Sequence, residues 1–151
     1  MRRIGITGGI GSGKSVVSRL LRIMGYSVYD TDSEAKRLME SSLEVVQKLS
    51  ECFGRDIYHN GRLNRGLLSS RVFGKSDKIV LLNSIVHPVV RFDFYRWSES
   101  LNEEICFVES AILYESRFDE LVDEVWTVTA PEELRISRVR QRSGLTEEEI
   151  K

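Results

Sequence analysis

The chain has 151 residues, of which 41% are hydrophobic and 30% are charged, a composition typical of one main globular domain. Its formal net charge of -1 excludes a global attraction to nucleic acid or to an anionic membrane, so any basic function must be local. No apolar run approaches membrane-spanning length, and the predicted first strand leaves no room for a signal peptide. We therefore expect a cytoplasmic protein with no nucleic-acid or membrane partner.

A glycine-rich loop lies between a short apolar strand, predicted over residues 3–7, and an amphipathic helix, predicted over 16–24. The loop fits the phosphate-loop pattern G-x-x-x-x-G-K-[ST] at every fixed position: Gly8-Gly9-Ile10-Gly11-Ser12-Gly13-Lys14-Ser15. In such a loop backbone N–H groups surround the phosphates, and a Cβ at Gly8 or Gly13 would obstruct them. The alternative is an ordinary glycine-rich turn before a helix, and the order of strand, loop and helix argues against it.

The residues of this loop have separate expected tasks. We expect Lys14 to reach the β and γ phosphates of a bound nucleotide and the Ser15 hydroxyl to ligate Mg²⁺. The N-terminus of the following helix adds partial positive charge beneath the phosphates. We therefore predict nucleotide contacts from the whole loop: Gly8, Gly9, Gly11, Ser12, Gly13, Lys14, Ser15 and the backbone of Val16.

Two aspartates follow a second parallel strand, predicted over residues 26–29. Asp30 and Asp32 then lie at the carboxyl end of the sheet, where open α/β sheets bind ligands. One carboxylate could accept a proton from an attacking hydroxyl or orient Mg²⁺ through water, with the other in support. Alternatively, either aspartate only caps the helix predicted over 33–40. The phosphate loop favours catalysis for Asp32, while both readings stay open for Asp30.

Residues 33–101 are predicted to form a helical insertion, because their apolar residues recur at helical spacing. Asn60-Gly61 is a turn signal that could join a minimal hairpin or lie in an irregular loop. Pro88 predicts the first turn of a further helix, and His87 could either contact substrate or only fix that helix start. His59 is expected to be exposed.

The strand predicted over residues 105–108 ends at Glu109, a secondary candidate for the metal environment. A capping or surface role for Glu109 is the alternative. A further strand is predicted over 125–128, and Pro131 then opens a helix with acidic residues in its first turn.

That helix carries arginines on one face by their i, i+3, i+7 spacing: Arg135, Arg138 and Arg142. Before a hinge at Gly144, the spacing favours a lid that brings arginines onto phosphates. Without an anion, we expect mutual repulsion to hold this face open and hydrated. The alternative is a solvated basic face with no ligand.

The remaining signals are weaker. Cys52 and Cys106 lack metal-binding spacing and are expected to be reduced core thiols. Residues 146–151 are typical of the first turn of a helix, so the chain is expected to stop as that helix begins.

Taken together, these motifs resemble the dephospho-coenzyme A kinase family, which phosphorylates the ribose 3′-hydroxyl of dephospho-CoA in the last step of CoA biosynthesis. Gly5-Ile6-Thr7 with the phosphate loop resembles that family's longer version of the motif. Asp30-Thr31-Asp32 is similar to its Asp-Ala-Asp segment, whose second aspartate is catalytic. Further segments resemble landmarks of the family's CoA-side domain and lid: residues 60–65, 72–73, 82–88, Arg138 and 142–144.

The resemblance implies that Asp32, Lys14 and Arg142 are catalytic and that ATP and Mg²⁺ are the cofactors. It also implies that Arg138 and Arg142 contact the nucleotide, and that Asp32, Arg65 and His87 bind the substrate. Ser15 would ligate Mg²⁺ through its hydroxyl, with Asp32 or Glu109 acting through water. The departures from the family's pattern are Ala111 for a proline, Asn64 for an aspartate and Val16 for a threonine. The first two place substrate contacts there in question.

We expect a three-layer α/β/α phosphate-loop fold with a parallel sheet, in which the family's last strand and helix are missing. The nucleotide-binding core would comprise residues 1–32 and 102–151 with a lid at about 131–145, and residues 33–101 would bind dephospho-CoA. Another small-molecule or nucleoside monophosphate kinase is the alternative. A nucleotide-switch protein is a further alternative, but no Asn-Lys-x-Asp guanine motif follows any predicted strand. A monomer is favoured, although nothing in the sequence fixes the oligomeric state.

Overall fold

The computed structural model describes residues 1–144. These residues divide into two compact units, of which unit 1 is Met1–Asp30 with the chain from Ser98 onward, and unit 2 is Thr31–Trp97. None of the helices within residues 1–144 is both long and apolar enough to cross a membrane. The predicted helix start at 146–151 lies outside the described residues, as does the last residue of the predicted lid.

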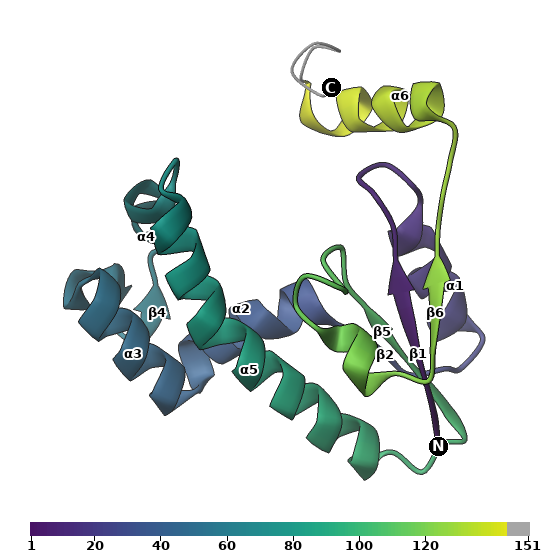
Figure 1. Cartoon of the computed structure of the whole chain (residues 1–151), viewed down its shortest axis with the longest axis horizontal. Helices are drawn as coiled ribbons and strands as arrows, with labels where there is room; N and C mark the ends of the chain where they lie inside the picture. The colour runs from purple at the N-terminus through teal and green to yellow at the C-terminus, as the bar shows by residue number, and fades with distance from the viewer. Residues whose placement is uncertain (145–151) are drawn as a thin grey trace. The chain divides into compact units, whose positions relative to one another are not determined.

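Unit 1 is built on a four-stranded parallel sheet with the strand order β2-β5-β1-β6 (Figure 1). The strands are β1 (Arg2–Thr7), β2 (Val28–Asp30), β5 (Ile105–Glu109) and β6 (Glu124–Thr127). Consecutive residues are buried from Ile4 to Thr7 in β1 and from Cys106 to Glu109 in β5, so both faces are covered there, as is usual for inner strands of a parallel sheet. The α/β class with a parallel sheet is therefore confirmed.

Helix α1 (Lys14–Ile23) follows β1 and packs on the sheet through Leu21. Leu21 forms a core cluster with Ile4, Ile6 and Phe107, so the strand that precedes the phosphate loop and the helix that follows it are held together. The second helix of unit 1 that bears on function is α6 (Glu132–Ser143), which begins after Pro131 as predicted. A short 3-10 helix, Phe118–Leu121, lies between β5 and β6.

Unit 2 is mainly helical. It comprises α2 (Thr31–Ser41), α3 (Leu43–Phe53), a 3-10 turn (Arg55–Ile57), the hairpin β3 (Tyr58–His59) and β4 (Arg62–Leu63), α4 (Arg65–Val72) and most of α5 (Ser76–Ser100). Asn60 and Gly61 join β3 to β4 with φ values of 49° and 75°, so the turn signal forms a hairpin rather than an irregular loop. His59 is exposed, as predicted.

Two predictions about unit 2 are wrong. Pro88 does not begin a helix, because it lies inside α5, which continues on both sides of it. Proline removes one helical hydrogen bond, but buried apolar residues before and after it, Val86 and Val90 among them, keep both halves packed.

Cys52 is exposed rather than a core thiol, whereas Cys106 is buried as expected, and burial raises the pKa of the Cys106 thiol.

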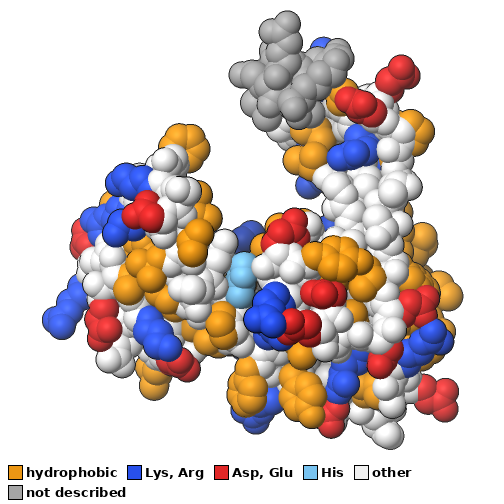
Figure 2. All heavy atoms as spheres, viewed as in Figure 1, with side chains coloured by type: hydrophobic (Ala, Val, Ile, Leu, Met, Phe, Trp, Pro, Cys, Tyr) orange, Lys and Arg blue, Asp and Glu red, His pale blue; other side chains and the backbone are white. Residues whose placement is uncertain are grey.

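The face of the molecule drawn in Figure 2 carries acidic and basic side chains in alternation, with hydrophobic side chains among them. Among the described residues in this view, no patch of a single charge sign covers the surface. This distribution agrees with the net charge of -1.

Candidate functional site

The carboxyl ends of the four parallel strands of unit 1 all carry polar side chains. β1 ends at Thr7, β2 at Asp30, β5 at Glu109 and β6 at Thr127. The register pairs Asp30 with Glu109 across β2 and β5, and Thr7 with Thr127 across β1 and β6. Because parallel strands end at the same edge of a sheet, the sequence gathers these groups where the phosphate loop leaves β1.

The phosphate loop leads directly into α1, whose first residue is Lys14. Gly13 caps the helix at φ 97°, a left-handed conformation that a residue with a Cβ rarely adopts. Since the first N–H groups of a helix have no intrahelical partner, they are available to an anion at this end. The first turn of α1 contains no acidic residue, so the positive end of the helix dipole is not neutralised from within the helix.

The packing around the loop explains one of its glycines and shows one unpaired hydroxyl. A Cβ added at Gly8 would lie 2.5 Å from the Val128 carbonyl oxygen and 2.7 Å from Ser12 Oγ, so this glycine is needed for close packing. Ser12 Oγ is a buried hydroxyl without a hydrogen-bond partner in the structure. A buried unpaired hydroxyl costs stability unless a ligand or water completes it. The Ser12 hydroxyl is therefore a polar group of the loop that its protein neighbours leave unpaired.

Lys14 lies against the end of β5. Its Nζ is 2.7 Å from Glu109 Oε1, and the two side chains are only 15% and 9% exposed. A surface role for Glu109 is thus wrong, because this carboxylate is buried beside the cation of the phosphate loop. Glu109 and Asp30 also share a register position, so two acidic residues accompany Lys14 at the strand ends.

Asp32 occupies a different element from Asp30. Asp30 is the last residue of β2, whereas Asp32 is an exposed residue in the first turn of α2, which begins at Thr31 instead of residue 33. Asp32 is therefore inside the helix and does not cap it from outside. A carboxylate in the first turn is favoured by the helix dipole. Its catalytic role stays a prediction.

The predicted substrate residues of unit 2 lie on separate helices. Arg65, the exposed first residue of α4, has its Nη2 3.8 Å from Glu40 Oε1. His87 is half-buried in α5, and burial lowers its pKa. Asn64 caps α4 by accepting a hydrogen bond from the Leu67 N–H at 3.0 Å. Asparagine and aspartate are equally good caps, so this departure from the family's pattern has a structural explanation.

The basic face of α6 meets the phosphate loop. Arg135 Nε donates to the Ile10 carbonyl at 3.0 Å, and Arg138 Nη1 donates to the Gly11 carbonyl at 3.0 Å. The expectation of an open, hydrated face is thus wrong for these two arginines, because backbone carbonyls accept from them in place of an anion. Arg142 is exposed one turn further on. The arginine spacing identified this face, but nothing in the sequence assigned Arg135 to the loop.

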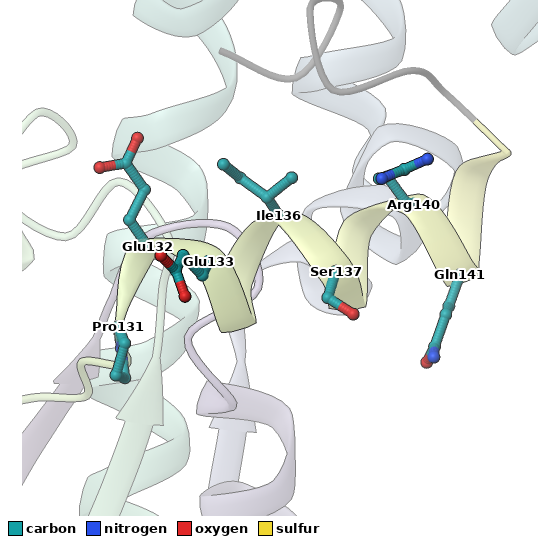
Figure 3. Close-up of a pocket in the computed structure, with 7 residues that line it drawn as sticks. All are labelled: Pro131, Glu132, Glu133, Ile136, Ser137, Arg140 and Gln141. Atoms are coloured by element: carbon teal, nitrogen blue, oxygen red, sulfur yellow. The ribbon is translucent and has the colours of Figure 1, made fainter.

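A hollow of about 760 Å³ lies on another side of α6 (Figure 3). Its described lining is Pro131, Glu132, Glu133, Ile136, Ser137, Arg140 and Gln141. Neither a phosphate-loop residue nor Arg135 or Arg138 is among them. The strand ends and the loop, not this hollow, therefore form the candidate nucleotide site.

Within residues 1–144, no group of three or more His, Cys, Asp or Glu side chains could hold a metal ion. Mg²⁺ does not need such a group, because it keeps several waters and takes one or two protein oxygens together with substrate phosphates. The exposed Ser15 hydroxyl and the Glu109 carboxylate are oxygen donors of this kind beside the loop. The chemistry of the site therefore fits a magnesium nucleotide.

Comparisons with known proteins show which family the chain resembles. The family model "CoaE: Dephospho-CoA kinase" matches residues 2–151. A dephospho-CoA kinase from Porphyromonas gingivalis is 46% identical over 151 residues, which cover 100% of this chain and 75% of that protein. The crystal structure of TT1252 from Thermus thermophilus superposes with a TM-score of 0.83 at 38% identity, over 99% of this chain and 76% of that one.

A dephospho-CoA kinase structure from Campylobacter jejuni has the same fold, with a TM-score of 0.70 at 24% identity over 99% of this chain and 77% of that chain. The family model spans the phosphate loop, both units and α6. The chain therefore belongs to the dephospho-CoA kinase family.

Proposed function

We propose that the chain transfers the γ-phosphoryl group of ATP to the ribose 3′-hydroxyl of dephospho-CoA, giving CoA and ADP, the final step of coenzyme A biosynthesis. The observation that carries this proposal is the phosphate loop of a dephospho-CoA kinase family member, in which Lys14 opens α1 directly after the left-handed Gly13. The family supplies the acceptor, and the loop supplies the site for the donor.

On the donor side, backbone N–H groups between Gly8 and Val16 hold the phosphates. The N–H groups of Ser12 and Val16 already donate to the Gly9 and Gly13 carbonyls, at 3.1 Å and 3.0 Å. Lys14 has two alternative anionic partners, because its ammonium pairs with Glu109 in the structure and phosphate oxygens would compete for it. Bound ATP would offer it phosphate oxygens instead, so Lys14 moves from a carboxylate to the β and γ phosphates. Charge neutralisation of this kind is the main catalytic contribution in phosphoryl transfer.

On the acceptor side, Asp32 accepts or orients the proton of the 3′-hydroxyl. Its place in the first turn of α2, exposed and directly after β2, leaves the carboxylate accessible to a substrate. Arg65 and His87 contact dephospho-CoA, and residues 33–101 form the substrate-binding region. Residues 1–32 and 102–151 then serve the nucleotide.

Arg138 and Arg142 of α6 stabilise the phosphates as a lid, with Arg142 acting on the transferring group. Mg²⁺ would be held by the Ser15 hydroxyl, with Asp32 or Glu109 through water, and it would supply neutralising charge to the β and γ phosphates. We further propose a cytoplasmic monomer.

The test is to measure formation of ADP and CoA from ATP and Mg²⁺ with dephospho-CoA, with a nucleoside monophosphate, and with no acceptor. We expect CoA and ADP in equal amounts with dephospho-CoA, and neither transfer nor rapid hydrolysis in the other two reactions. Transfer to the monophosphate would favour the alternative kinase. Nucleotide hydrolysis that is independent of any acceptor would favour a nucleotide switch.

A further inference from the structure

Arg135 of α6 contacts the phosphate loop on the side where carbonyl groups of the loop point outward. Its Nε donates to the Ile10 carbonyl at 3.0 Å, and Arg138 Nη1 donates to the Gly11 carbonyl at 3.0 Å. These two acceptors belong to successive peptide groups in the middle of the loop. Two guanidinium groups thus fix the direction of two neighbouring carbonyls.

The direction of a carbonyl determines the direction of the next N–H. In a trans peptide these groups point to opposite sides, and the described chain contains no cis peptide. With the Ile10 carbonyl held toward α6, the Gly11 N–H points away from α6. Gly11 has a φ of 75° and no side chain to restrict it, so without this bond the Ile10–Gly11 peptide could rotate at little cost.

The second peptide group extends the network within the loop. The Ser12 N–H donates to the Gly9 carbonyl at 3.1 Å, while the carbonyl of the same peptide group, that of Gly11, accepts from Arg138. Hydrogen bonds at the two ends of one peptide group polarise each other, most of all when one donor is charged. The arginines therefore support the internal turn of the loop as well as its direction.

Two glycines of the loop, Gly9 and Gly11, pack directly against Arg135. A Cβ at Gly9 would lie 2.5 Å from Arg135 Nη2, and a Cβ at Gly11 would lie 2.6 Å from the Arg135 carbonyl oxygen. Both positions accept any residue in the general phosphate-loop pattern. In this chain the absence of a Cβ at Gly9 and Gly11 allows the first turns of α6 to pack against the loop.

We propose that Arg135 is a positioning residue, which docks α6 on the carbonyl side of the phosphate loop at Gly9 and Gly11 and so holds the loop N–H groups in the orientation that receives phosphates. The proposal rests on the proposed function only in taking ATP as the ligand of the loop. By linkage, bound nucleotide stabilises the docked α6 to the same extent as the docked α6 favours nucleotide.

The experiment measures ATP affinity by calorimetry, without acceptor or turnover, for Arg135→Ala, Arg135→Lys and the control Arg140→Ala. Arg140 is an exposed arginine of the same helix that lines the hollow instead. Loss of the charge-assisted bond should weaken ATP binding about tenfold for Arg135→Ala. Arg135→Lys should recover part of this loss of affinity, because the lysine ammonium can still donate to one carbonyl. The control Arg140→Ala should bind ATP about as tightly as the original chain. Equal effects of Arg135→Ala and Arg140→Ala would overturn the proposal.

A double-mutant cycle that combines Gly9→Ala with Arg135→Ala tests the packing. In the chain that keeps Arg135, the added methyl should disturb docking and weaken ATP binding. In the chain that already carries Arg135→Ala, the same methyl should cost much less, because the guanidinium that it would meet is gone. Additive effects would show that Gly9 and Arg135 act separately and would contradict the docking.

Amide hydrogen exchange in the absence of nucleotide separates this proposal from the proposed function. Arg135→Ala should speed exchange at the Ser12 amide, whose N–H donates to the Gly9 carbonyl, and Arg140→Ala should not. If the original chain bound no ATP, the proposed function would fail, and the exchange rates would still decide the role of Arg135. Unchanged exchange at the Ser12 amide would refute that role.

Discussion

Lys14 Nζ and Glu109 Oε1 are 2.7 Å apart, although 95 residues separate them in the chain. The pair connects the first residue of α1 to the last residue of β5, and both side chains are nearly buried. The lysine expected to serve only the phosphates therefore also neutralises a buried carboxylate. We therefore expect Lys14 to contribute to the stability of unit 1 as well as to the proposed phosphoryl transfer.

The first prediction separates these two tasks. Lys14→Met should abolish phosphoryl transfer and also lower the free energy of unfolding by about 3 kcal/mol, because the buried Glu109 carboxylate loses its ion pair with the Lys14 ammonium. Adding Glu109→Gln should restore most of the stability and none of the transfer. Urea unfolding and single-turnover assays on the single and double variants measure both effects. Normal stability of Lys14→Met would mean that the pair contributes nothing to the fold.

The second prediction concerns Asp32. If Asp32 is the general base that we propose, Asp32→Asn should lower turnover by about two to four orders of magnitude, with little change in ATP affinity. Glu34→Gln is the matched control, because Glu34 is also acidic in the first turn of α2 and accepts a hydrogen bond from Arg37. Calorimetric titration with ATP and steady-state rates distinguish the roles. A collapse of ATP binding would instead assign Asp32 to the metal or the fold.

A third prediction addresses Arg142, which is exposed near the end of α6. Arg142→Lys keeps the charge but loses the planar group that can bridge two phosphate oxygens. Turnover should therefore fall by about tenfold or more while ATP affinity changes less, as for a contact that strengthens in the transition state. Arg140→Lys is the control from the same helix. If affinity and transfer rate fell equally, Arg142 would be a ground-state binding contact.

The fourth prediction follows from His87, whose pKa is lowered by burial from the usual 6.5. Below pH 6.5 the unfolded chain binds more protons than the folded one, so the free energy of unfolding should decrease as the pH falls toward the folded-state pKa. Above pH 6.5 the contribution of His87 is complete and independent of pH. His87→Gln should remove this decrease, and His59→Gln, in the exposed hairpin, is the control for losing an imidazole. Chemical unfolding between pH 7 and about pH 5 measures the free energy of unfolding at each pH. If this free energy decreased just as steeply in His87→Gln, the decrease would not come from His87.

Local signals in the sequence were sufficient for the elements that carry the donor site. The apolar run of β1, the glycine loop and the amphipathic α1 were predicted in the correct order, with α1 beginning two residues earlier because Gly13 caps it. Asn60-Gly61 likewise indicated a turn, and the structure decided for the hairpin over an irregular loop. These features depend on residues close in sequence, whose dihedral preferences and periodicity are readable one segment at a time.

Contacts between distant segments were decided by tertiary structure. Pro88 remains inside α5 because apolar packing on both sides outweighs one missing hydrogen bond, and no local rule measures that balance. The Lys14–Glu109 pair depends on where β5 ends relative to β1, which is a matter of sheet register.

The sequence by itself therefore determined the phosphate loop, the parallel α/β sheet and the basic face of α6. Tertiary structure alone decided what that face meets: the guanidinium of Arg135 reaches the Ile10 carbonyl because β6 runs beside β1 and delivers α6 over the loop. Spacing along a helix shows which side chains share a face. Only the packing of strands far apart in the chain shows which surface that face contacts.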